Sequence, residues 1–153
     1  MPVITICSSA NFYEKAVALQ EQLEKHSGYT VVVPDMANEM KRTGDFEVSH
    51  YKTWFADPGD YGKKAELMHG HFDKVAAGDA ILVLNYEKNG KENYIGGNVL
   101  MEMGLAFHLK IPIFILNEAP EESAFLEEIL GMLPILLHGK IEDLPSEFEK
   151  LQA

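Results

Sequence analysis

The chain has 153 residues, 46% of them hydrophobic and 24% charged, which is the composition of an ordinary globular protein. This length can bury a core without disulfides or metals, and it predicts one domain over 1–153. The net charge of −11, from 24 acidic and 13 basic residues, argues against nucleic-acid binding, which depends on Lys and Arg contacts with phosphates. A small anion can still bind, because helix N-termini and loop amides create local positive potential.

The first 60 residues contain two predicted strands and one predicted helix. The run "VITIC" (3–7) predicts a buried strand, 12–26 predicts an amphipathic helix, and "YTVVV" (29–33) predicts a second strand. Residues 35–60 show no clear pattern apart from the turn signal "FADPGDYG". Long connections in compact domains tend to be lids or binding loops, and we expect that role for this stretch.

The remaining sequence alternates helices and strands. In chain order, we expect a helix at about 61–77, a strand at 80–85, a helix at about 97–109, a strand at 112–116, a helix from 120 to about 130, a strand at 134–138 and a helix at 143–151. This alternation predicts an α/β fold, a flavodoxin- or Rossmann-like three-layer sandwich with a five-stranded parallel sheet. The order 2-1-3-4-5 fits five strands and brings the C-terminal ends of strands 1 and 3 together at a switch point.

The N-terminal segment and the cysteine content bear on the compartment of the protein. The N-terminus lacks the basic region of a signal peptide, and no apolar run reaches the roughly 20 residues of a membrane span. Cys7 is the only cysteine, which excludes an internal disulfide and fits a reducing compartment. We therefore expect a cytoplasmic protein with no membrane partner. Because Cys7 lies in an apolar run, we interpret it as a packed core residue rather than a nucleophile.

The loop after the first strand carries polar groups to the switch point. Ser8, Ser9 and Asn11, followed by Phe12, place hydroxyls and free amides at the start of a helix, where they can cradle a phosphate or a sugar. The alternative is ordinary helix capping by Ser9 or Asn11. We predict that these four residues bind substrate.

The third strand delivers a second polar set to the same edge. Asn85 ends this strand, and the following loop contains Tyr94, Gly96, Gly97 and Asn98. Glycines here would let a ligand approach the backbone, although they could equally form a turn. The sequence contains neither a GxGxxG motif nor a P-loop. We predict that these five residues also bind substrate.

Glu102 is an acid within an otherwise apolar helical face. It lies about one turn into the helix at 97–109, and its side chain is expected to lean toward the helix N-terminus and the cleft. Leu105, Ala106 and Leu109 follow one and two turns later, so the acid shares a face with core residues. A structural ion pair with Lys or Arg would explain such an acid. A carboxylate at this rim could instead attack a sugar C1 or stabilise an oxocarbenium-like transition state.

Several segments together resemble a known family. "SSANFY", "GDAILVLN", "EMGLA" (102–106) and "KIPIFIL" (110–116) look like the core of the nucleoside 2-deoxyribosyltransferase-like superfamily, which includes the deoxynucleoside-monophosphate N-glycosidases. The resemblance implies that Glu102 displaces a base and forms a glycosyl-enzyme intermediate, which water or a second base then resolves. It also implies homo-oligomers in which a neighbour's C-terminal loop completes each site, and it calls for no cofactor.

Three positions depart from the family pattern. The family usually has Asp or Ser six residues before the nucleophile, where this chain has Gly96, and Gly four residues before it, where this chain has Asn98. A family Asp that contacts the base falls on His71. We predict that His71 binds or protonates the base, because imidazole titrates near neutrality, with capping or core packing as the alternative.

Other residues near the cleft could hold parts of a ligand. His69 and His71 are two apart on a helix and cannot chelate one metal from one face, so we predict no metal site. One lysine could contact a phosphate, and the candidates are Lys52, Lys63, Lys64, Lys88 and Lys91. Trp54 and Phe55 could stack on a base or pack within the 35–60 segment.

These observations predict an enzyme that cleaves or exchanges the N-glycosidic bond of a nucleoside or nucleoside monophosphate. The alternative is a binding or sensing module that holds a nucleotide or sugar phosphate without turnover. A phosphoacceptor receiver domain is rejected, because strand 3 ends in Asn85 rather than Asp. The segment 127–139 has more apolar side chains than a small domain readily hides, so we expect a homodimer or higher oligomer, with Asn117 or Met132 near the partner's cleft.

Overall fold

A computed structural model describes residues 1–153 and contains one five-stranded sheet. All strand pairs are parallel and the order is β2-β1-β3-β4-β5, which confirms the predicted fold class and strand order. The strands are β1 (Val3–Ser8), β2 (Thr30–Val32), β3 (Ala80–Leu84), β4 (Ile113–Ile115) and β5 (Ile135–Leu136).

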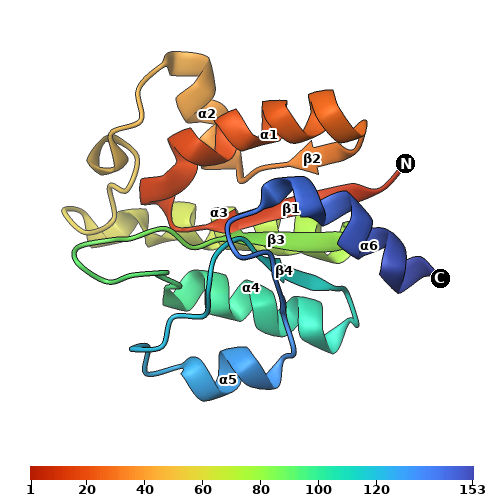
Figure 1. Ribbon diagram of the computed structural model, residues 1–153. Helices are drawn as coiled ribbons and strands as arrows, with labels where there is room; N and C mark the ends of the chain where they lie inside the picture. The colour runs from red at the N-terminus through yellow and green to blue at the C-terminus, as the bar shows by residue number, and fades with distance from the viewer.

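Helices cover both faces of this sheet (Figure 1). They are α1 (Tyr13–Ser27), α2 (Asp35–Thr43), α3 (Tyr61–Ala77), α4 (Gly97–His108), α5 (Leu126–Gly131) and α6 (Leu144–Gln152). One buried cluster joins the sheet to α1 and α6, and a second joins it to α3, α4 and α5. No helix is both long and apolar enough to cross a membrane.

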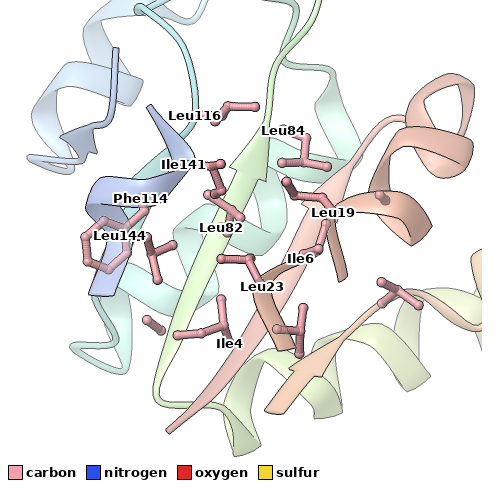
Figure 2. Packing of buried hydrophobic residues seen from close by; sticks show 14 of the residues in the cluster. Ile4, Ile6, Leu19, Leu23, Leu82, Leu84, Phe114, Leu116, Ile141 and Leu144 are labelled. Carbon is pink, nitrogen blue, oxygen red and sulfur yellow. The ribbon is translucent and has the colours of Figure 1, made fainter. Parts of the chain in front are cut away.

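Alternation along the central strands explains the two clusters. Ile4 and Ile6 of β1 belong to the first cluster, whereas Cys7 belongs to the second, as the two-residue period of a strand requires. Figure 2 shows the first cluster, in which Leu19 of α1 and Leu144 of α6 pack on the same side of the central strands. Both faces of β1 and β3 are therefore buried, and Thr5 is the one polar residue in the interior of these two strands.

The sheet places the ends of β1 and β3 side by side. Ser8, the last residue of β1, pairs with Leu84, the last residue of β3. From these ends, the chain passes to α1 on one face and to α4 on the other. This divergence creates the crevice at the carboxyl edge where open α/β sheets bind ligands.

The segment 35–60 differs from the expected loop, because it begins with helix α2. Met36, Ala37 and Met40 form its buried face, and the φ of +75° at Gly44 allows this glycine to end the helix. The remainder consists of turns and short 3-10 helices, and Trp54 packs against the α2 methionines. The helix was not predicted because only three core residues mark it within a charged sequence.

Two C-terminal elements are shorter than predicted. The helix expected from residue 120 begins at Leu126, because the backbone N–H of Phe125 donates to the Ser123 hydroxyl and favours a turn before it. The strand expected over 134–138 contains only Ile135 and Leu136. Leu133 and His138 have positive φ values of 53° and 54°, which are incompatible with extended strand backbone.

Candidate active site

A cavity of about 190 Å³ lies at the carboxyl edge of the sheet. It is formed by the loop after β1, the 35–60 segment, α3, the loop after β3 and the first turns of α4. Eight of the predicted site residues line it: Ser8, Ser9, His71, Tyr94, Gly96, Gly97, Asn98 and Glu102. The other three, Asn11, Phe12 and Asn85, lie outside its lining.

Glu102 is the most deeply buried acid of the site, with an exposed fraction of 2%. Asn98, one turn earlier on α4, donates a hydrogen bond of 3.2 Å from its Nδ2 to Glu102 Oε2. No Lys or Arg forms an ion pair with this carboxyl, so the structural pair considered from the sequence is absent. Burial raises the pKa of Glu102 to about 7, and the Cys7 thiol and the Lys64 charge partly oppose this rise.

His71 approaches Glu102 from α3. Its Nε2 lies 3.9 Å from Glu102 Oε2 and 3.7 Å from Cys7 Sγ, and its exposed fraction is 5%. Burial lowers the pKa of His71 to about 4, and the positive charge of Lys74 lowers it further. The imidazole is therefore neutral near pH 7.

Cys7 is a free thiol behind this pair. It is fully buried in the second hydrophobic cluster, in agreement with its prediction as a core residue. Cys7, His71 and Glu102 place three ligand-type atoms within 4.8 Å of one another, a grouping that sequence reasoning missed because it combines β1, α3 and α4. Burial, followed by the charge of Glu102, raises the pKa of this thiol, which keeps the sulfur protonated in the metal-free protein.

Tyr13 is a further cavity residue that was not singled out from the sequence. It is the first residue of α1, and burial, followed by the charge of Glu102, raises the pKa of its phenol. Its position directly after the β1 loop could have identified it, because side chains there face the switch point.

The serines after β1 do not cap the following helix. No side-chain cap hydrogen bond forms at the start of the 3-10 turn or of α1, so the capping alternative for Ser9 and Asn11 is wrong. Ser9 Oγ instead accepts a hydrogen bond of 3.2 Å from Lys88 Nζ. Asn11 is exposed, and Phe12 is buried against Tyr86 with a ring-centroid distance of 5.3 Å.

Asn85 joins the loops that follow β3 and β4. Its Nδ2 donates to the backbone oxygen of Glu118 at 2.7 Å, and its Oδ1 accepts from the backbone N–H of Asn117 at 2.9 Å. The side chain is fully buried, and these bonds commit it to the scaffold. Asn117 in turn donates from Nδ2 to the Asn85 backbone oxygen at 3.2 Å, so the predicted partner-facing residue also has an internal role.

Tyr94 occupies the space beside Gly96. A Cβ atom at Gly96 would lie 2.9 Å from the Tyr94 hydroxyl, which is closer than real Cβ contacts allow. Gly97 has no atom within 4 Å of the corresponding position. The Tyr94 side chain therefore fills the space that a side chain at position 96 would occupy.

Aromatic and basic residues complete the rim. Lys52, Lys64 and Lys88 line the cavity, whereas Lys63 and Lys91 do not. Trp54 lines the cavity with an exposed fraction of 3%, and it packs within the 35–60 segment as one of the two predicted alternatives requires. Phe55 is 72% exposed and lies outside the lining.

A wider depression of about 840 Å³ lies beside the cavity, between residues 90–97 and 118–125. The two hollows share Tyr94, Gly96 and Gly97. The wider one is acidic, because four glutamates and one lysine line it: Glu92, Glu118, Glu121, Glu122 and Lys91. The buried Glu102–His71 pair belongs to the smaller cavity alone.

Comparisons of the chain with protein-family models, with curated proteins and with solved structures found no match. The function must therefore be inferred from the residues of the cavity and from the motifs quoted above.

Proposed function

We propose that the protein cleaves or exchanges the N-glycosidic bond of a nucleoside or nucleoside monophosphate, with Glu102 as the nucleophile. The observation that supports this most is a buried carboxyl without a cationic ion-pair partner, held by Asn98 at the ligand-binding edge of the sheet. A structural acid would be expected to have its charge compensated, and a surface acid would not be buried. The raised pKa is typical of a carboxyl in a functional site.

The proposed reaction has two steps. Carboxylate Oε of Glu102 bonds to C1′ of the sugar while the bond from C1′ to the base nitrogen breaks, and the departing base takes up a proton. Water then attacks C1′, the ester bond to Glu102 breaks, and the carboxylate is regenerated as the water loses a proton. A second base in place of water would give exchange instead of hydrolysis.

We propose a positioning role for His71. With its pKa lowered to about 4, the ring carries a single N–H proton near pH 7 and holds no excess proton for the leaving base. A neutral ring 3.9 Å from Glu102 can fix the carboxyl by a hydrogen bond as the site closes on substrate. The proton for the base then comes from solvent.

The sugar contact is assigned to Tyr94. Its hydroxyl lies beside Gly96, where the resembling family has an acid or a serine that holds the sugar. A phenol can donate and accept hydrogen bonds with sugar hydroxyls, so it can supply the same contact.

Base release tests the proposed function. The protein is incubated with a panel of nucleosides and nucleoside 5′-monophosphates, with and without an acceptor base, and free base is separated by chromatography. Release that disappears in Glu102→Gln supports the proposal. A folded sample that releases no base at high protein concentration contradicts it and favours the alternative of a binding or sensing module, which Gly96 and His71 support because they replace family acids.

We also propose that the chain works as a homodimer or higher oligomer. Ile129 and Leu137 of the segment singled out from the sequence are buried in the monomer, but Leu130 and Leu133 are 48% and 82% exposed. Phe107 on α4 is another large exposed apolar side chain. Apolar groups of this size are common at interfaces between subunits.

A reducing compartment such as the cytoplasm suits this site. The only thiol of the chain, Cys7, lies within 4.8 Å of ligand-type atoms of His71 and Glu102. Oxidation of the sulfur would introduce a polar group beside the reacting carboxyl.

A further inference from the structure

Cys7, His71 and Glu102 form a second chemical grouping within the site. His71 Nε2 lies 3.7 Å from Cys7 Sγ and 3.9 Å from Glu102 Oε2, and one ligand-type atom of each side chain lies within 4.8 Å of the other two. A thiol, an imidazole and a carboxyl are the side-chain groups that bind zinc in proteins. The expectation of no metal site concerned His69 and His71 on one helix, whereas this grouping takes its members from β1, α3 and α4.

The spacing of the three atoms is close to that of a tetrahedral zinc site. Bonds of about 2.3 Å to sulfur and about 2.0–2.2 Å to nitrogen and oxygen place neighbouring ligand atoms about 3.4–3.6 Å apart. The two distances that end at His71 Nε2, 3.7 Å and 3.9 Å, exceed this spacing by little. Rotation of the Cys7 and Glu102 side chains can shorten the third distance, which lies within 4.8 Å. An ion can therefore bind without movement of the strand or the helices.

The charges of these ligands match a divalent cation. Coordination displaces the Cys7 proton to solvent, so the thiolate and the Glu102 carboxylate carry two negative charges, and the neutral imidazole adds none. A bound Zn²⁺ makes the buried group neutral as a whole, which lowers the cost of burying its charges. Lys64 acts on Glu102 and opposes a cation, but two anions in direct contact with the ion outweigh one more distant charge. Lys74 acts on the imidazole, but it is paired with Asp35 at 2.6 Å.

The imidazole of His71 is free to coordinate an ion. Its ring is buried, yet Nδ1 makes no hydrogen bond of good geometry, and Nε2 has only the long contacts with Cys7 and Glu102. The backbone of Ile6 raises the pKa of the ring, as a hydrogen-bond acceptor does. An ion on Nε2 would select the tautomer with its proton on Nδ1, where the Ile6 carbonyl can accept it, as is usual for metal-bound histidine.

The cavity gives an ion access to this group. His71 and Glu102 line the cavity, and Cys7 is fully buried behind them. The ligands favour zinc over Mg²⁺ and Ca²⁺, because those ions require several oxygen ligands, whereas thiolate and imidazole suit zinc. Three protein ligands leave a fourth position for water.

We infer that Cys7, His71 and Glu102 bind a zinc-type divalent cation, and that the bound ion inhibits base release. A carboxylate that coordinates the ion donates its electron pairs to the metal and is not available to bond to C1′ of a sugar. The ion and its water also occupy part of the cavity of about 190 Å³ that the sugar must enter. The metal site does not depend on the proposed function, whereas the inhibition rests on it. Zinc is thus a regulator of the enzyme rather than its cofactor.

Cobalt binding tests the site directly, because Co²⁺ accepts the same types of ligand as zinc and its absorbance reports a bound thiolate. The full chain is freed of metal with EDTA, exchanged into chelator-free buffer and titrated with cobalt chloride. We expect a sulfur-to-cobalt charge-transfer band that saturates at one ion per chain and disappears as zinc is added. Only Cys7 can produce this band, since the chain has no other cysteine. Metal bound at a surface pair such as His50 and Asp45 gives no such band.

Variants of each ligand and a matched control assign the site. Cys7→Ala should lose the band, and His71→Gln and Glu102→Gln should weaken zinc binding at least about tenfold, since loss of an outer-sphere partner alone costs that much. His69→Gln is the control, because it removes an exposed imidazole from the same helix, outside the cavity lining, and it should retain wild-type affinity. Urea denaturation verifies that each variant folds. Should Cys7→Ala fail to fold, the isosteric Glu102→Gln decides.

Base release measured with and without zinc tests the inhibition. In the metal-free wild type, zinc at about ten times its Kd should lower the rate about tenfold, since about one site in eleven stays free. Cys7→Ala should still release base and should respond little to the same zinc concentration. His69→Gln should be inhibited as the wild type is.

The possible outcomes separate the two proposals. Absence of the charge-transfer band, or equal zinc affinities of His69→Gln and the ligand variants, would overturn the metal site. A ligand-dependent band together with base release that zinc leaves unchanged, or with release that requires zinc, would overturn the inhibition. The same band in a protein that releases no base with or without metal would support the site and contradict the N-glycosidase function, and the inhibition with it.

Discussion

The sharpest prediction concerns the stability of Glu102→Gln as a function of pH. Burial raises the pKa of Glu102 from 4.5 to about 7, a difference of 2.5 pH units. At 1.36 kcal/mol per unit, the folded state disfavours the ionised carboxyl by about 3 kcal/mol. The unfolded chain loses this proton near pH 4.5, so wild-type stability falls as the pH rises from 4.5 to 7 and is constant above it. Gln has nearly the same shape and remains neutral at every pH, so the stability of Glu102→Gln does not fall over this pH range.

We therefore expect Glu102→Gln to be about 3 kcal/mol more stable than wild type at pH 8, with the difference shrinking toward pH 5. Urea denaturation at pH 5, 6, 7 and 8, at constant ionic strength, measures it. Glu66→Gln is the control, because Glu66 is an exposed α3 acid without an ion pair. If Glu102→Gln is less stable than wild type at pH 8, or differs from it equally at every pH, the carboxyl is structural and the reasoning fails.

Three further predictions concern the sugar contact, the scaffold and the assembly. Gly96→Ser should displace Tyr94 and lower kcat/KM for base release by about tenfold or more, while Gly104→Ala, at an α4 position outside the cavity lining, has little effect; equal effects would contradict the Tyr94 assignment. Asn85→Leu should reduce the free energy of unfolding by about 3 kcal/mol in urea, because backbone groups of residues 117 and 118 lose buried partners; a change below about 1 kcal/mol would contradict this role. Light scattering should show an oligomer for the wild type and a shift toward monomer for Leu133→Lys, and a monomeric wild type would end the assembly proposal.

The strand order was predictable because the hydrophobic pattern that indicates it extends over entire segments. The runs that became β1 and β3 are apolar at every interior position except Thr5, and such runs between helices favour a parallel sheet with both faces covered. Helix α2 was missed although Met36, Ala37 and Met40 recur at helical spacing, because these three residues lie within a strongly polar segment. Its amphipathic face depends on contact with α1 and α3, which the local sequence does not reveal.

The site was predictable to the extent that it depends on topology. Residues that directly follow β1 and begin α4 reach the cavity because parallel strands end at the same edge. Asn85 also directly follows its strand, but its side chain does not line the cavity, because its amide forms hydrogen bonds with backbone groups of residues 117 and 118. The juxtaposition of Cys7 with His71 required the packing of α3 on β1, and no spacing along the chain encodes it.

The departures from ordinary folding rules are concentrated at one edge of this molecule. Elsewhere, apolar strands are buried, Lys41 pairs with Glu21, and Asn85 has its hydrogen bonds satisfied. At the cavity, a buried carboxyl has no cationic partner and three lysines have no acid. Each set could neutralise the other, yet the ion pair between Lys64 and Glu102 is not formed. Sites at which a sequence violates the rules it otherwise follows are expected to be functional. A buried carboxyl that no cation neutralises is the group that the proposed N-glycosidase requires, because Glu102 must stay free to attack C1′ of the sugar.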